Sequence, residues 1–138
     1  MRVLFDTNVV LDLLLDRTPH ALVAARLVTA VERKELAGLL CATSVTTLDY
    51  LIARAIGREK ARGAIRALLR MFEVAAVTRA ILEAALEIDV DDYEDAVLHE
   101  AGQGAEAEAI VTRNASDFKG ATLPIFSPAE LVAALEES

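Results

Sequence analysis

The chain has 138 residues, of which 54% are hydrophobic, and a formal net charge of −8. This length is that of one ordinary domain, able to bury roughly two-thirds of its unfolded surface, and the composition excludes a disordered or fibrous protein. The single cysteine, Cys41, excludes a disulfide framework and a thiolate zinc cluster and suits a reducing cytosol. No apolar run approaches the roughly 18 residues of a membrane span, and strand-like residues directly after Met1 leave no room for a signal peptide. We therefore expect one soluble cytoplasmic domain, residues 1–138, with no membrane contact.

Charged residues are unevenly distributed along the sequence. Between Arg79 and Arg113 there are ten acids and no Lys or Arg, whereas from Arg54 to Arg70 six basic residues accompany one acid, Glu59. Such segregation allows an acidic pocket beside a basic surface, although the net charge by itself argues against a nucleic-acid partner. Ordinary solvated helix faces are the alternative explanation for both segments.

Short apolar runs alternate with helical patterns. In chain order we expect a strand at 3–5, a helix at 18–34, a strand at 38–42, helices at 43–56 and 58–71, a strand at 72–77, helices at 78–88 and 93–103, strands at 109–112 and 123–126, and a terminal helix from 127. Thr18-Pro19 is typical of an N-cap and first helical residue, Gly57 separates two helices, and Ser127 with Glu130 forms a capping-box pattern. Strands that alternate with helices predict an α/β fold with a central, mostly parallel sheet and helices on both faces.

Four aspartates that are distant in sequence follow the predicted strands or begin nearby helices: Asp6, Asp49, Asp95 and Asp117. Ligands of open parallel sheets bind beyond the carboxyl ends of the strands, so these carboxylates can point into one cavity. Taken singly, each is readily explained as a helix cap or turn residue. Their shared placement at strand ends is what favours a site.

A cluster of carboxylates requires a cation. Two carboxylates about 4 Å apart repel by roughly 4 kcal/mol at an effective dielectric near 20. Hard oxygen ligands select Mg²⁺ or Mn²⁺, and such an ion can polarise a phosphate and lower the pKa of a bound water without a histidine base. The histidines are His20 and His99; His99 shares a helical face with Asp95, but we interpret it as a structural histidine, and Cys41 as part of the core.

Several motifs in this order resemble the PIN domain family, and most closely its VapC-type toxin ribonucleases. They are Asp6-Thr7-Asn8, Thr46-x-x-Asp49, the run DYEDAV from Asp92 to Val97, and TRNxxDF from Thr112 to Phe118. The resemblance covers nearly the whole chain. It implies a three-layer α/β/α PIN-like fold with a mostly parallel five-stranded sheet. It also implies an endoribonuclease that depends on Mg²⁺ or Mn²⁺, an RNA substrate, a small protein antitoxin and a homodimer.

The resemblance also implies roles for particular residues. The metal-site acids are Asp6, Asp95 and Asp117, and the expected supporting residues are Thr7, Asn8, Glu94, Thr112 and Asn114. The family's second acid is usually Glu, whereas this chain has Asp49 as a fourth catalytic candidate, one methylene shorter and expected to reach the metal through water. An alternative register puts Thr47 at that position and leaves it without an acid.

A basic stripe is the expected RNA contact. Its members recur every four residues and therefore share one helix face: Arg58, Arg62, Arg66 and Arg70. A solvated outer face is the alternative interpretation of this stripe.

We interpret the chain as the ribonuclease toxin of a type II toxin-antitoxin system, hydrolysing RNA by metal-activated water. A non-catalytic PIN-like domain that binds RNA or protein remains the alternative, because the second acid departs from the family pattern. A phosphatase of the haloacid-dehalogenase type also begins with a strand-end aspartate, but it requires a second Asp where Asn8 stands.

Overall fold

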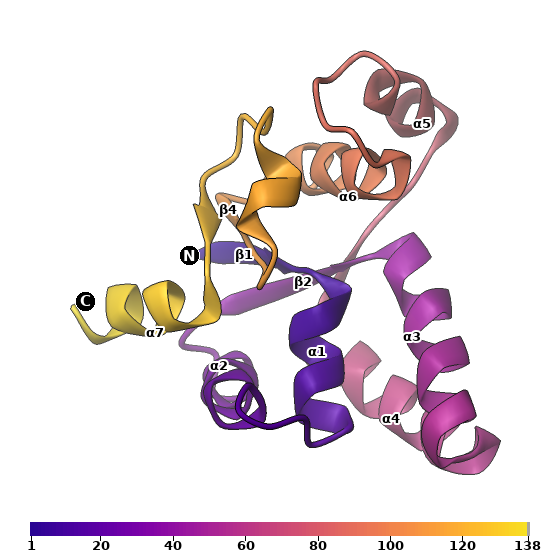
Figure 1. Ribbon diagram of the computed structural model, residues 1–138, viewed down its shortest axis with the longest axis vertical. Coiled ribbons are helices and arrows are strands. Elements are labelled where there is room, and N and C mark those ends of the chain that lie inside the picture. The colour runs from indigo at the N-terminus through magenta and orange to yellow at the C-terminus, as the bar shows by residue number, and fades with distance from the viewer. Residues whose placement is uncertain (138) are drawn as a thin grey trace.

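The computed structural model describes residues 1–137 and contains a five-stranded parallel sheet between two layers of helices (Figure 1). The strand order is β3-β2-β1-β4-β5, and every neighbouring pair is parallel. The strands are β1 (Arg2–Phe5), β2 (Ala37–Cys41), β3 (Glu73–Ala75), β4 (Ala109–Val111) and β5 (Ile125–Phe126). The helices are α1 (Thr7–Leu14), α2 (Ala21–Glu32), α3 (Ala42–Ile56), α4 (Arg58–Met71), α5 (Arg79–Ala85), α6 (Tyr93–Gly104), the 3₁₀ helix η1 (Ala115–Phe118) and α7 (Pro128–Glu136). The predicted α/β class, parallel sheet and two helical layers are confirmed.

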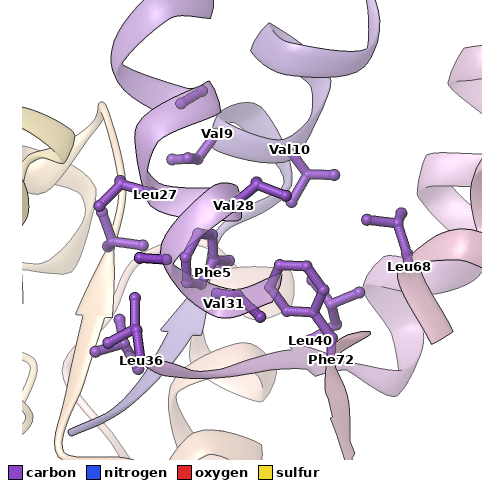
Figure 2. Close-up of a cluster of buried hydrophobic side chains, with 14 of the residues drawn as sticks. Phe5, Val9, Val10, Leu27, Val28, Val31, Leu36, Leu40, Leu68 and Phe72 are labelled. Atoms are coloured by element: carbon purple, nitrogen blue, oxygen red, sulfur yellow. The ribbon is translucent and has the colours of Figure 1, made fainter. Parts of the chain in front are cut away.

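Both faces of the sheet are buried, which explains why most of the strand residues are apolar. Successive strand side chains point to opposite faces. Val3 and Phe5 belong to the core under α1, α2, α3, α4 and α7, whereas Leu4 belongs to the core under α5 and α6. Figure 2 shows the first of these cores, where residues of α2 and β2 surround the ring of Phe5. Phe5 also meets Phe72 edge to face, with ring centroids 5.1 Å apart, which joins the central strand to the end of α4.

The first helix, α1, was not expected from the sequence. Its eight residues, TNVVLDLL, span only about two helical turns, which is too short for a clear helical periodicity to show in the sequence. The helix expected from Thr18 begins at Ala21, and the cis peptide Thr18-Pro19 lies in the preceding turn. The strands expected at 72–77 and 123–126 are also shorter than predicted, at three and two residues.

Other local predictions are confirmed. Gly57 separates α3 from α4 with a φ of 97°, a left-handed conformation that favours glycine. Ser127 and Glu130 form the expected capping box at the start of α7. None of the helices within residues 1–137 is long and apolar enough to cross a membrane.

Two loops at the carboxyl edge of the sheet touch at Gly120. A Cβ atom placed on Gly120 would overlap the carbonyl oxygen of Asp89, so only glycine allows the loop after η1 to approach the loop before α6. These two loops flank the acids Asp95 and Asp117. Gly120 therefore helps to set the distance between both sides of the candidate site.

We expect Gly120→Ala to lower the free energy of unfolding by about 1–3 kcal/mol, because the backbone must shift to relieve the overlap. Gly63→Ala is the matched control, since Gly63 lies inside α4 and a methyl group added there would have no neighbour within 4 Å. The control should raise stability by about 0.5–1 kcal/mol through its better helix propensity. Urea unfolding of both variants checks this, and equal stabilities would contradict the role given to Gly120.

Candidate active site

Asp6 stands at the junction of β1 and α1, where hydrogen bonds hold its side chain from two directions. It is the N-cap of α1, and its Oδ1 accepts a hydrogen bond from the Thr7 backbone N–H at 2.8 Å. Its Oδ2 accepts a hydrogen bond from the Thr112 hydroxyl at 2.7 Å. This bond links the end of β1 to the end of β4. Because both carboxylate oxygens have a donor, the carboxylate is held in one orientation.

Asn8, Thr112 and Asn114 surround Asp6. The side-chain amide of Asn8 donates to Asp6 Oδ2 at 3.4 Å, and the Asn114 backbone N–H donates to the Thr112 hydroxyl oxygen at 3.0 Å. Thr112 is fully buried, so its hydroxyl needs these partners. The structure therefore brings the predicted supporting residues from the β1 and β4 ends together around one carboxylate.

The start of α6 supplies the next acids. Asp92 is the N-cap, and its Oδ1 accepts from the Asp95 backbone N–H at 3.0 Å. Glu94 and Asp95, in the first helical turn, line the same cavity as Asp6, whereas Asp92 faces an adjoining hollow. The start of α6 therefore contributes two of its three acids to the cavity that contains Asp6.

A cavity of about 360 Å³ gathers residues from several strand ends. Its lining includes Asp6, Thr7, Asn8, Glu94, Asp95, Asn114 and Asp117, together with Thr43, Ser44 and Thr47 of α3. An adjoining hollow of about 420 Å³ shares Asp95 and Asp117 with it. The predicted metal-site acids Asp6, Asp95 and Asp117 thus share one cavity at the carboxyl edge of the sheet, where parallel sheets place ligands.

Mutual repulsion and burial disfavour the charged forms of these acids. Burial raises the pKa of Asp6, partly offset by the hydrogen bonds from Thr112 and Thr7. Burial, followed by the charge of Asp6 and then of the other nearby acids, raises the pKa of Asp95 to about 7. No cationic side chain of residues 1–137 is among the groups that shift the pKa values of these two acids.

The donor set suits a hard divalent cation. The acidic part of the cavity offers carboxylate, amide and hydroxyl oxygens, the ligands that Mg²⁺ prefers. Within residues 1–137, no three acidic, histidine or cysteine side chains are already grouped closely enough to hold a metal ion. Mg²⁺ does not require such a group, because it is usually bound through one or two carboxylates and keeps several waters.

Asp49 does not join the other acids. Its Oδ1 accepts from Arg62 Nε of α4 at 3.0 Å, and the α3 residue that lines the cavity at this level is Thr47. Two residues along a helix differ by about 200° in direction, so Thr47 and Asp49 cannot both face the cavity. Leu48 and Ile52, both fully buried, set the rotation of α3 against the core. The geometry agrees with the register in which this position carries no acid.

The basic stripe lies on the exposed face of α4. Arg58, Arg62, Arg66 and Arg70 are all exposed, and none of them lines the acidic cavity. Arg62 is occupied by its ion pair with Asp49. A role of the stripe in RNA binding stays a prediction.

Three charged residues beside the acids were not identified as candidate site residues from the sequence. Asp12 of α1 is buried and bonded to Arg17 and Arg113, and both arginines line the cavity. Asp12 lies one helical turn after Asn8, and Arg113 lies inside the TRN motif, so the spacing from Asn8 was the available signal.

His99 is a structural histidine, as interpreted from the sequence. Its Nε2 accepts from the backbone N–H groups of Thr122 and Leu123 at 3.1 and 3.2 Å, while Nδ1 lies 2.9 Å from Glu100 Oε2. These bonds assign the proton to Nδ1 and fasten α6 to the loop before β5.

Comparison with known proteins identifies the family. The sequence matches the PIN domain family over residues 2–116, so the chain belongs to the PIN domain family. No protein with a curated description matches the sequence.

Solved structures share the fold at low sequence identity. VapBC2 from Rickettsia felis, bound to a promoter DNA fragment, has a TM-score of 0.72 and 12% identity, covering 92% of this chain and 98% of that chain. A toxin-antitoxin complex from Klebsiella pneumoniae has a TM-score of 0.68 and 22% identity, covering 91% and 97%. VapC20 from Mycobacterium tuberculosis, a sarcin-ricin-loop-cleaving toxin, has a TM-score of 0.61 and 17% identity, covering 78% and 86%. The predicted PIN-like fold is confirmed.

We expect Asp95 to make the metal-free protein less stable as the pH rises from about 4 to about 7. Because the folded-state pKa of Asp95, about 7, exceeds its ordinary value of 3.8, the folded state binds this proton more tightly. The resulting stabilisation is complete below about pH 4 and is lost as the pH rises through about 7. Unfolding of the wild type and Asp95→Asn in chelator checks this, since their difference cancels the titrating groups that do not interact with Asp95. The wild type should lose stability relative to Asp95→Asn as pH rises, and a pH-independent difference would contradict it.

Proposed function

We propose that this protein is an endoribonuclease that depends on Mg²⁺ or Mn²⁺, and the toxin of a type II toxin-antitoxin system. The observation that carries the proposal is the convergence of Asp6, Asp95 and Asp117 in one cavity of a PIN domain. Burial and the neighbouring acids raise the pKa of Asp95 there, so its charged form is disfavoured. A bound divalent cation would relieve the repulsion among these acids. The proposal extends to hydrolysis of RNA phosphodiesters by water.

The fold neighbours support the partners that we propose. The Klebsiella pneumoniae structure is a toxin-antitoxin complex, and VapC20 is a toxin that cleaves the sarcin-ricin loop. By analogy, we propose an RNA substrate, a small protein antitoxin and a homodimer for this chain. Fold likeness alone does not define a substrate, so the assignment rests on the acids of the cavity together with family membership.

The proposed roles follow from position. Asp6, Asp95 and Asp117 would hold the ion, which when bound supplies Lewis-acid polarisation of the phosphate and a more acidic water. Thr112 and the Thr7 backbone N–H orient Asp6 by their hydrogen bonds. Asn8, Glu94 and Asn114 line the same cavity and can bind the ion's waters. Such supporting partners commonly change metal affinity or activity by about 10- to 100-fold.

We expect Asp6→Asn and Asp95→Asn each to reduce RNA cleavage by at least about 100-fold, because each removes a ligand charge at constant volume. Each variant should fold, and its stability should hold or rise as carboxylate repulsion is relieved. Cleavage of RNA by purified protein with Mn²⁺, with and without chelator, measures the effect. Near wild-type cleavage by either variant would contradict the site assignment.

Two further substitutions serve as controls for this experiment. Glu87→Gln removes an exposed acid that does not line the cavity and should leave cleavage unchanged. Asp49→Asn removes the acid that pairs with Arg62 and should have much less effect than Asp6→Asn. If Asp49→Asn lost as much RNA cleavage as Asp6→Asn, Asp49 would have to be counted among the metal-site acids.

A second candidate is a non-catalytic PIN domain that binds RNA or protein. It is favoured by one observation: the cavity has Thr47 where the family usually has an acid. RNA binding without cleavage by the wild type, in Mg²⁺ and in Mn²⁺, would select this function over the first.

We also propose that the α4 stripe binds RNA phosphates. Single-stranded RNA releases counterions on binding, so the log–log dependence of affinity on salt has a slope of about −0.7 per phosphate contact. Replacing both Arg58 and Arg66 with Ala should flatten that slope by roughly one unit or more. The control is the double variant Arg33→Ala with Arg79→Ala, which removes the same charge from exposed positions elsewhere. Equal slopes in the two double variants would assign the stripe to ordinary solvated surface.

A further inference from the structure

A buried carboxylate beside the acidic cavity binds two arginines. The side chain of Asp12 in α1 is only 1% exposed. Arg113 donates to it through a two-bond fork, Nε to Oδ2 at 2.6 Å and Nη2 to Oδ1 at 3.2 Å. Arg17, from the turn after α1, donates from Nε to Oδ1 at 3.0 Å.

Both arginines also belong to the wall of the cavity. Arg17 and Arg113 line it together with Asp6, Asp95 and Asp117, and their side chains are 40% and 29% exposed. Within residues 1–137, Nη1 of Arg17 and Nη1 of Arg113 have no hydrogen-bond partner in the protein. Each arginine is therefore oriented by Asp12 while part of its donor edge stays available.

The charges of this group do not cancel. Asp12 carries one negative charge, and Arg17 and Arg113 carry one positive charge each. The group therefore has a net charge of one positive unit, opposite in sign to the acids of the cavity. One arginine would neutralise Asp12 if the group served only to join α1 to the end of β4. The cavity thus combines an acidic part that suits a cation with a guanidinium part that suits an anion.

We propose that Asp12, Arg17 and Arg113 form a binding subsite for a backbone phosphate of the RNA substrate. Planar guanidinium groups bind phosphate oxygens through paired hydrogen bonds, and orientation by a buried carboxylate reduces the entropy lost on binding. The subsite holds the substrate chain next to the acids, which would otherwise repel it. Asp12 is a positioning residue, and the arginines touch the substrate. This inference rests on the proposed RNA substrate, but it does not require that the protein cleave RNA.

Direct RNA binding tests the subsite without relying on cleavage. In an Asp6→Asn background, the dissociation constant for a single-stranded RNA is measured as a function of salt, from about 50 to about 200 mM. Adding Arg17→Ala should weaken binding and flatten the log–log salt slope by about 0.7, the value for one phosphate contact. Arg17→Lys should restore most of the slope, because it restores the charge.

Two controls separate a binding role from a structural role. Arg79→Ala removes one exposed positive charge away from the cavity and should leave the slope unchanged. Arg113→Gln repeats the test with a neutral side chain that can still donate to Asp12, and it decides the outcome if Arg17→Ala does not fold. A folded Arg17→Ala or Arg113→Gln variant with the parent's salt slope would overturn the subsite. Absence of cleavage by the wild type would overturn the nuclease assignment alone, since the slope is measured on binding.

Discussion

The hydrogen bond between the Thr112 hydroxyl and Asp6 joins the sheet to the candidate site. It connects the carboxyl ends of two neighbouring parallel strands, β1 and β4, across 2.7 Å. Since parallel strands end at the same edge, residues more than a hundred positions apart meet there without any special loop. Asp6 is also the N-cap of α1, so the same carboxylate starts the first helix. The ends of both strands contribute residues to the cavity that also contains Asp95 and Asp117.

Electrostatic repulsion is the cost of this arrangement. Acids at the end of β1 and in α6 and η1 share one cavity, and the pKa of Asp95 is raised first by burial and then by the charges of its acidic neighbours. Natural proteins keep such clusters mainly at functional sites, where a ligand supplies the missing charge. The ion group of Asp12 places opposite charge close by without neutralising the acids, because its own carboxylate already binds both guanidinium groups. One cavity can therefore accommodate a cation and an anionic chain side by side.

The basic segment and the acidic segment of the sequence lie in different places relative to the cavity. Acids near the start of α6 turn into the cavity, whereas the arginines of α4 lie on an exposed face outside it. Arg62 nevertheless connects the two helices α3 and α4 through Asp49. A net charge of −8 thus says little about nucleic-acid binding, since the local sign of charge differs from one face to the next.

The sequence by itself determined the fold class, most element positions and three of the four acids that were expected to meet. Apolar runs such as Val3 to Phe5 identify strands that are buried on both faces, and a polar residue directly after a strand must lie at the sheet edge. Only the tertiary structure decided the direction of Asp49 and the partners of Asp12. Burial of Leu48 and Ile52 sets the rotation of α3, which turns Thr47 to the cavity and Asp49 to Arg62. The direction of a helical side chain depends on how the whole helix packs against the core, and motif spacing within one segment does not contain that information.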